Sequence, residues 1–122
     1  WEKQCEMVYE IAMASKEVVE ERGIEGVALY ATPFLKFLAT VAAAGFLLEQ
    51  AVIAVSKLDQ LIAEKAVKDS DVEAFLENNH EARFFNNKRI TAQNFVDTIV
   101  PEAEALLAGA KSRNYGALDI NF

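Results

Sequence analysis

The stretch ATPFLKFLATVAAAGFLLEQAVIA, residues 31–54, decides the fold of this chain. From Phe34 to Val55 its apolar residues surround a helix instead of forming one stripe. A helix that is apolar on all sides must be covered on several of them. We therefore expect a long helical segment from about Val27 to Val67, with Pro33 in its first turn and Thr32 as a candidate N-cap.

The most apolar part of this segment, FLATVAAAGFLL from Phe37 to Leu48, lies between Lys36 and Glu49. It is well short of the ~20 residues that span a bilayer. The sequence therefore predicts a buried helix here and no membrane span.

The composition restricts the partners and the compartment. The chain has 122 residues, 12 basic and 19 acidic side chains and a net charge of -7, so it is expected to form one domain and not to bind nucleic acid. Its single cysteine, Cys5, cannot form an internal disulfide, which favours a cytoplasmic protein. Because the chain begins at Trp1 without an initiator methionine or a signal peptide, we expect a fragment of a longer protein.

An amphipathic helix is predicted from Trp1 to Arg22, ended by Gly23 and Gly26. The apolar or small residues at its steps of three and four predict one buried face, made of Trp1, Cys5, Val8, Ala12, Ser15 and Val19.

A third helix is expected to begin at the capping-box pattern of Ser70 and Glu73. Pro101, followed by acidic residues, predicts a bend or a new helix near Val100. Residues 111–122 lack periodicity and are expected to form an irregular tail. The apolar face predicted for this half contains Phe75, Phe84, Thr91 or Ala92, Phe95, Ile99, Ala103 and Leu106. The fold class is all-α, an antiparallel up-and-down bundle of three to four helices.

No residue of this chain is assigned a catalytic, cofactor-binding or metal-binding role. There is no glycine-rich phosphate loop and no paired-cysteine spacing, and His80 is the only histidine. We interpret His80 as a surface or cap residue, and Cys5 as a buried and unreactive thiol.

Two polar features allow a functional reading beside a structural one. Glu49 interrupts an apolar run, so it lies at the solvent or pairs with a cation, or else is a buried general base. Arg83, Lys88 and Arg89 form the only local basic cluster, but helical geometry divides them between faces. The cluster is therefore predicted to be a solvated surface in preference to an anion site, whereas Phe84 is predicted to lie in the core.

Two stretches together resemble the C-terminal helical extension of a subgroup of acyl-CoA dehydrogenases, the type that includes 3-methylmercaptopropionyl-CoA dehydrogenase. ATPFLKF, residues 31–37, is similar to that module's A-x-P-[YF]-L-[RK]-[LF] entry. FFNNKRITAQNFVDTIVPEA, residues 84–103, matches its aromatic pair with a lysine, its later aromatic residue and its aliphatic-Pro-Glu-Ala turn. The ending GALDINF is also similar. The chain departs from the pattern at Asn86, Asn87 and Asn94 and in its acidic first helix.

The resemblance implies a parent enzyme that is a flavoprotein of fatty acid metabolism. It would use FAD to remove a proton and a hydride from the α,β carbons of an acyl-CoA thioester. The flavin and the catalytic glutamate would lie in other domains, so this chain alone is expected to be inactive. Its expected partners are those domains and further copies in a homo-oligomer. The alternatives are a stand-alone helical adaptor or dimerisation module and a small enzyme that uses Glu49.

Overall fold

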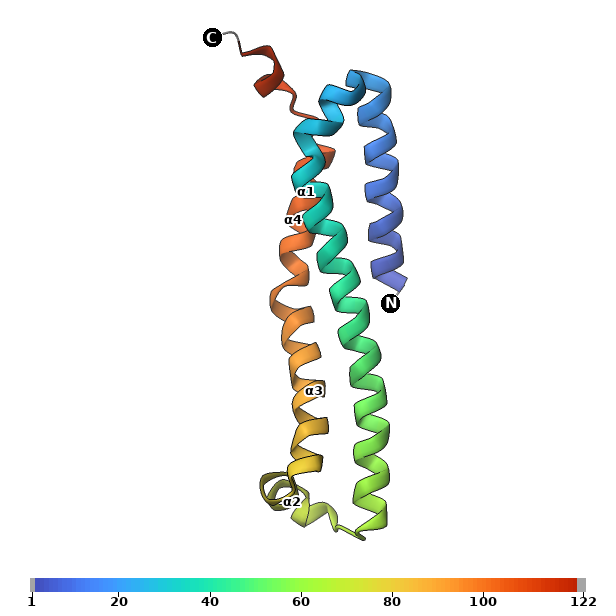
Figure 1. Ribbon diagram of the computed structural model, residues 1–122, viewed down its shortest axis with the longest axis vertical. Coiled ribbons are helices and arrows are strands. Elements are labelled where there is room, and N and C mark those ends of the chain that lie inside the picture. Colours follow the sequence, from blue (N-terminus) through green and yellow to red (C-terminus); the bar gives the residue numbers. More distant parts are fainter. Residues whose placement is uncertain (1, 121–122) are drawn as a thin grey trace. The chain divides into compact units, whose positions relative to one another are not determined.

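The computed structural model describes residues 2–120, apart from the side chain of Gln4, and these residues form helices and connecting turns without a strand (Figure 1). The α-helices are α1 (Glu2–Glu64), α2 (Val72–Asn78), α3 (His80–Thr98) and α4 (Val100–Lys111). Two short 3-10 helices are η1 (Asp69–Asp71) and η2 (Gly116–Asp119). The predicted class, an all-α antiparallel bundle of three to four helices, is confirmed.

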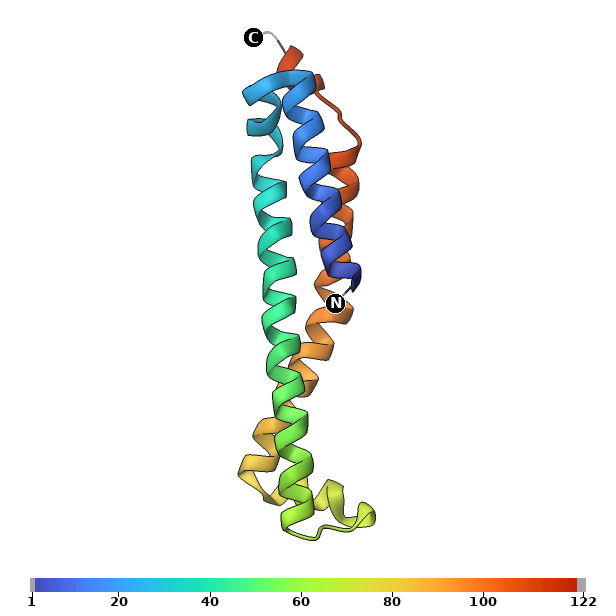
Figure 2. The ribbon, with the colours of Figure 1, turned by 90° about the vertical axis from the view of Figure 1, so that its right-hand side faces the viewer.

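The helix α1 consists of two arms, residues 2–22 and 24–64, joined at Gly23. This glycine has φ 61° and ψ -147°, a backbone conformation that side chains with a Cβ atom strongly disfavour. The chain reverses here, so that the first arm lies beside the start of the second (Figures 1 and 2). Gly26 lies inside the second arm and is buried. The prediction of a break at this glycine pair is therefore confirmed at Gly23.

Replacing Gly23 by alanine should lower the free energy of unfolding by about 1–3 kcal/mol. The reason is backbone strain alone, because a Cβ atom at this position meets nothing within 4 Å. Gly109→Ala is the matched control, since this glycine lies within α4 and also has open space around it. Alanine there should stabilise the helix by about 0.5–1 kcal/mol. Chemical denaturation of both variants checks the prediction, and equal effects at the two positions would contradict it.

The chain divides into two compact units. Unit 1 comprises the described residues of 1–43 and 98–122, and unit 2 comprises residues 44–97. The core of unit 1 joins the two arms of α1 to α4. It contains Met7, Ile11, Val18, Tyr30, Phe34, Phe37, Val41, Ala103, Leu107 and Ala110.

Ion pairs show the helix directions in unit 1. Lys3 pairs with Glu104, and Glu10 pairs with Lys111, so the first arm of α1 runs parallel to α4. The start of the second arm runs the opposite way, since the hydroxyl of Tyr30 reaches the backbone of Asn114 just beyond α4. Unit 1 is therefore an up-down-up bundle.

In unit 2, the remainder of α1 packs antiparallel to α3. Lys88 donates a hydrogen bond to Gln50, and Lys57 lies over the ring of Phe85. The two helices are connected by η1 and α2, and Asn79 accepts a hydrogen bond from the backbone N–H of Ala82 at the start of α3. Asparagine at this position caps the new helix, which explains why α2 and α3 are separate.

Several local predictions are wrong. The buried face of the first arm is Met7, Ile11, Ala14 and Val18, whereas Cys5, Val8, Ala12 and Val19 are exposed and Ser15 is half-buried. The predicted and the observed buried residues have the same spacing along the helix, but the observed ones are displaced by one residue, or 100° of helix rotation. The observed residues also carry the larger apolar side chains. Trp1, also placed on the predicted face, lies outside the described residues.

Two predicted helix starts also differ from the structure. Pro33 lies inside the second arm, which already begins after Gly23, so Thr32 is not an N-cap. The hydroxyl of Ser70 donates to Asp71, and α2 begins at Val72 without a side-chain cap. The prediction of a new helix at Pro101 is confirmed, since α4 begins at Val100 with the proline in its first turn.

Candidate functional site

A shallow groove of about 230 Å³ in unit 2 collects the aromatic and basic residues of α3 against the second arm of α1. We call it the aromatic groove. It is lined by Gln50, Ile53, Ala54, Lys57, Phe84, Phe85 and Lys88. The rings of Phe84 and Phe85 meet edge to face at 5.6 Å between their centroids.

The two lysines of the aromatic groove are held against its rings. The Nζ atom of Lys88 lies 5.6 Å from the ring centroid of Phe84 and donates a hydrogen bond of 3.0 Å to Gln50 Oε1. The Nζ atom of Lys57 lies 5.9 Å from the ring centroid of Phe85. Such cation–π contacts are weakly stabilising at exposed positions.

Large apolar side chains of unit 2 point outward. Phe84 is 50% exposed and Ile53 is 52% exposed. Phe46, at 67%, lies two helical turns before Ile53 on the same side of α1. The prediction that Phe84 lies in the core is therefore wrong.

Small side chains occupy the inside of unit 2. Its buried residues are Ala44, Ala54, Leu58, Ala82 and Ala92. Alanines let two helices approach closely, but they bury little apolar area. Leu58 is the one large side chain among them, and Phe85 and Phe95 are half-buried, whereas Phe46, Ile53 and Phe84 remain exposed.

Replacing Ala92 by leucine should lower the free energy of unfolding by about 1–3 kcal/mol, because the larger side chain does not fit the closely packed interior. Thr91→Leu is the matched control, since the neighbouring side chain is exposed and the change should stay within about 0.5 kcal/mol. Thermal unfolding followed by circular dichroism measures both. A loss at Thr91 as large as the loss at Ala92 would contradict the alanine packing.

The residues singled out in the sequence do not come together. Glu49 and His80 are exposed, so the buried general base is wrong and the surface reading of His80 is confirmed. Cys5 is exposed and not buried as expected. Arg83 and Arg89 make separate contacts, with the Glu77 carbonyl and with Asn86, so the basic residues do not form one anion site. Among residues 2–120, no group of three or more His, Cys, Asp or Glu side chains could hold a metal ion.

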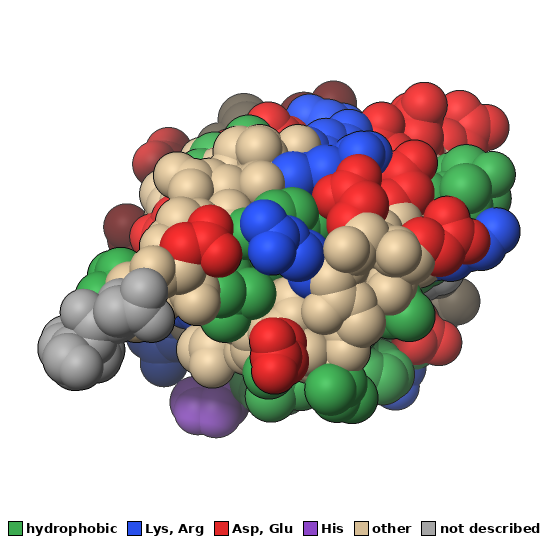
Figure 3. All heavy atoms as spheres, turned by 90° about the horizontal axis from the view of Figure 1, so that it is seen from above, with side chains coloured by type: hydrophobic (Ala, Val, Ile, Leu, Met, Phe, Trp, Pro, Cys, Tyr) green, Lys and Arg blue, Asp and Glu red, His purple; other side chains and the backbone are tan. Residues whose placement is uncertain are grey.

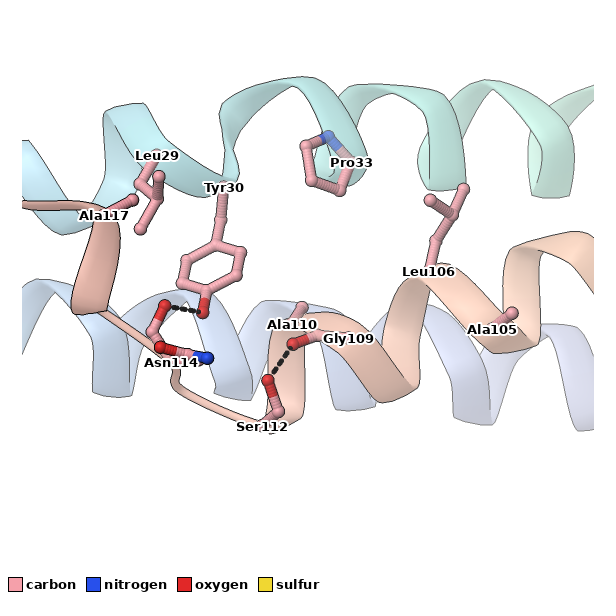
Figure 4. A pocket seen from close by; sticks show the side chains of 10 residues that line it. All are labelled: Leu29, Tyr30, Pro33, Ala105, Leu106, Gly109, Ala110, Ser112, Asn114 and Ala117. Atoms are coloured by element: carbon pink, nitrogen blue, oxygen red, sulfur yellow. Dashed lines mark hydrogen bonds between the residues drawn. The ribbon is translucent and has the colours of Figure 1, made fainter.

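A second groove, of about 460 Å³, lies in unit 1 between the second arm of α1, α4 and the tail (Figure 4). It is lined by Leu29, Tyr30, Pro33, Ala105, Leu106, Gly109, Ala110, Ser112, Asn114 and Ala117. The hydroxyl of Tyr30 donates to the carbonyl of Asn114 at 2.8 Å, and the hydroxyl of Ser112 donates to the carbonyl of Gly109 at 2.7 Å. The groove is thus mainly apolar, and its side-chain hydroxyls are already paired.

A polar cluster fixes the tail beside this groove. Arg113 donates to Glu21 at 2.7 Å and pairs with Glu17, and the hydroxyl of Tyr115 donates to Glu21 at 2.8 Å. No sequence pattern predicts these contacts, because the partners are more than 90 residues apart and the tail has no periodicity. Figure 3 shows that acidic and basic side chains are adjacent over this end of the molecule.

The pKa values in the cluster follow its contacts. The Tyr115 hydroxyl, followed by the charge and hydrogen bond of Arg113, holds the pKa of Glu21 below its usual value. Burial and the hydrogen bond to Glu21 raise the pKa of Tyr115. The contribution of Glu21 to stability is present above its unfolded pKa and is lost as the pH falls through the lower folded value. The contribution of Tyr115 is lost as the pH rises through its raised pKa, so the cluster is intact at neutral pH.

The central apolar helix is less buried than expected. In the stretch from Phe37 to Leu48, Phe37, Val41 and Ala44 are buried, but Leu38 and Phe46 are exposed. One described helix, Cys5–Glu64, is long and apolar enough to cross a membrane by length and composition, with a window of mean hydropathy 1.9 that is 22% buried. A core helix of a soluble protein passes the same test. The expectation that this stretch is buried throughout is therefore wrong.

The fold defines a class of protein, the all-helical domain, and several large apolar side chains of unit 2 are exposed. The comparison with protein families specifies it further. The family model described as Acetyl-CoA dehydrogenase C-terminal like matches residues 2–121, so the chain belongs to this family. The expected relation to the C-terminal domain of acyl-CoA dehydrogenases is thereby confirmed. Neither the curated proteins nor the solved structures yield a match.

Proposed function

We propose that this chain is the non-catalytic C-terminal helical domain of a flavin-dependent acyl-CoA dehydrogenase of the 3-methylmercaptopropionyl-CoA type. The parent enzyme would oxidise the α,β carbons of an acyl-CoA thioester in the cytoplasm. The domain would pack on the catalytic body through unit 2. The family match supports the kind of enzyme, and the two sequence stretches described above support the subgroup.

The observation that carries the packing role is the inverted distribution of apolar residues in unit 2. Its interior is mostly alanine, whereas Phe46, Ile53 and Phe84 are exposed. At about 25 cal/mol per Å² of apolar surface removed from water, aromatic and branched side chains gain far more from burial than alanine does. Covering these three exposed side chains would therefore stabilise a contact between unit 2 and a catalytic body.

The larger groove of this chain does not fit the FAD of the parent enzyme. A dinucleotide requires cationic side chains or free backbone N–H groups for its pyrophosphate. The larger groove, in unit 1, is lined by no lysine or arginine, and the hydroxyls of Tyr30 and Ser112 are engaged with backbone carbonyls. We therefore assign the flavin to the catalytic body and no flavin contact to these residues.

The purified 122-residue chain should be colourless and should not acquire a flavin absorbance band when FAD is added. The parent enzyme, expressed from the complete reading frame, should be yellow and should oxidise acyl-CoA thioesters. Flavin bound by the isolated chain would contradict the proposal, as would a complete reading frame without a dehydrogenase body. In that second case, a stable dimer of the isolated chain in light scattering would instead support the dimerisation module.

A further inference from the structure

We propose that residues 112–120 form a strap that closes the Tyr30 end of the groove in unit 1, and that a surface latch holds this strap shut. The latch consists of Arg113 and Tyr115 on the tail with Glu17 and Glu21 on the first arm of α1. Opening the latch releases the strap and leaves the helical bundle folded. This inference is independent of the proposed function.

The strap forms one wall of the groove. Asn114 and Ala117 contribute to its lining, as seen in Figure 4. The Tyr30 hydroxyl donates to the carbonyl of Asn114, and the ring of Tyr115 meets the ring of Tyr30 edge to face at 6.0 Å. Lifting the strap would therefore uncover Tyr30 and lengthen the open part of the groove.

The latch is built from exposed charges. The side chains of Arg113, Glu17 and Glu21 each retain about two fifths of their exposure in spite of their contacts. Arg22 reinforces the latch, because its guanidinium lies 5.3 Å from the centroid of the Tyr115 ring and 3.9 Å from Asp119. Exposed ion pairs are individually weak and are screened by salt, so such a latch opens far more readily than a helical core.

The backbone at Arg113 indicates that the latch is more than a chance surface contact. This residue follows α4 with φ 49°, in the left-handed region where glycine or asparagine is usual. A side chain with a Cβ atom is unfavourable there. The position nevertheless holds an arginine, and its guanidinium contacts both carboxylates of the latch.

Little apolar burial opposes the release of the strap. Among its described residues only Tyr115 is half-buried, and the others are exposed. Apart from the hydrogen bond that the Asn114 carbonyl accepts from Tyr30, its backbone contacts are local, such as those from Leu118 N–H to the Tyr115 carbonyl and from Gly116 N–H to the Asn114 side chain. Segments with few buried contacts open separately from the core.

Limited digestion with chymotrypsin tests the latch, because cleavage after Tyr115 requires its ring to leave Tyr30. At low protease concentration the cleavage rate follows the population of the open strap. In the Arg113→Gln chain this rate should rise about fivefold to tenfold, the change that corresponds to losing one or two surface ion pairs. Salt at 1 M, where the Debye length is ~3 Å, should raise the wild-type rate in the same direction, after correction with a reference peptide.

Two variants distinguish loss of the latch from other causes of faster cleavage after Tyr115. Arg113→Gly removes the guanidinium but suits the left-handed backbone, so it should also accelerate cleavage. Lys3→Gln removes an ion pair between the first arm of α1 and α4, away from the strap, and should leave the rate unchanged. The apolar dye ANS should bind the Arg113 variants more strongly than the wild type, because the groove is open.

Four results with the variants would overturn the proposal, and a fifth concerns the site of cleavage. These are an unchanged cleavage rate in Arg113→Gln, an unchanged rate in Arg113→Gly, equal acceleration in Lys3→Gln, and accelerated cleavage without increased dye binding. Cleavage after Phe34 or Phe37 that rises together with cleavage after Tyr115 would also overturn it, since this would mean that the bundle itself unfolds.

Discussion

Replacing Phe37 by alanine should lower the free energy of unfolding by about 3–5 kcal/mol. The side chain of Phe37 is 0% exposed and lies in the core cluster of unit 1, beside residues from the first arm of α1 and from α4. Removing the ring loses its transfer free energy and leaves a cavity that the surrounding helices fill only partly. Denaturant unfolding measures the change.

Leu35→Ala is the control for this prediction. Leu35 is 70% exposed on the same helix, two residues before Phe37. Its truncation in the isolated chain should change the free energy of unfolding by no more than about 0.5 kcal/mol. If the two variants lost equal stability, the assignment of the buried face of α1 would be wrong.

The sequence was sufficient to predict the helical class and two of the helix boundaries, at Gly23 and at Pro101. Gly23 was recognisable because it follows an amphipathic helix, and the structure places it in a conformation that favours glycine. Pro101 was recognisable because a proline followed by acidic residues suits a first helical turn. Such signals are local, so they can be read without knowing what the helix packs against.

The buried faces were harder to predict, because a spacing of three and four residues fits more than one face of a helix. In the first arm, Met7 and Val18 lie inward, whereas the adjacent Val8 and Val19 are exposed. Which face of the first arm is buried depends on the helices that pack against it, which are the second arm of α1 and α4 in unit 1. In unit 2 the prediction that Phe84 is buried failed for another reason. The two helices pack through alanines, and the apolar side chain of Phe84 lies outside their interface.

The contacts of the tail could not be predicted from local patterns. Arg113 meets Glu17 at a sequence separation of 96 residues, and Tyr115 meets Glu21 at 94. Contacts at this distance follow from the parallel alignment of the first arm with α4. Only the folded arrangement brings these charges together.

Introducing negative charge into the exposed apolar side of unit 2 should have the largest effect on the parent enzyme. The double variant Phe46→Glu with Ile53→Glu should unfold like the wild type in the isolated chain, because both side chains are mostly or half exposed there. In the parent enzyme the same change would bury two carboxylates against an apolar partner, which is strongly unfavourable. Buried interface anchors typically contribute about 2 kcal/mol or more each, so the contact with the catalytic body should be lost.

The parent enzyme carrying this double variant should therefore show separate thermal transitions for the catalytic body and the helical domain. Ala74→Glu is the matched control, since it adds a carboxylate at an exposed position of α2. It should leave a single cooperative transition. Wild-type behaviour of the double variant in the parent enzyme would show that the catalytic body does not cover these side chains.

Side-chain footprinting of Phe46, Ile53 and Phe84 tests the central claim most directly, by comparing the isolated chain with the complete parent enzyme. The labelling of these three residues should fall several-fold in the complete enzyme, whereas Phe37, which is fully buried in the chain itself, should remain unlabelled in both. Protection of the isolated chain that increases with its concentration would instead indicate a second copy on this surface. Equal labelling of the three residues in the isolated chain and in the complete enzyme would show that the catalytic body does not cover unit 2.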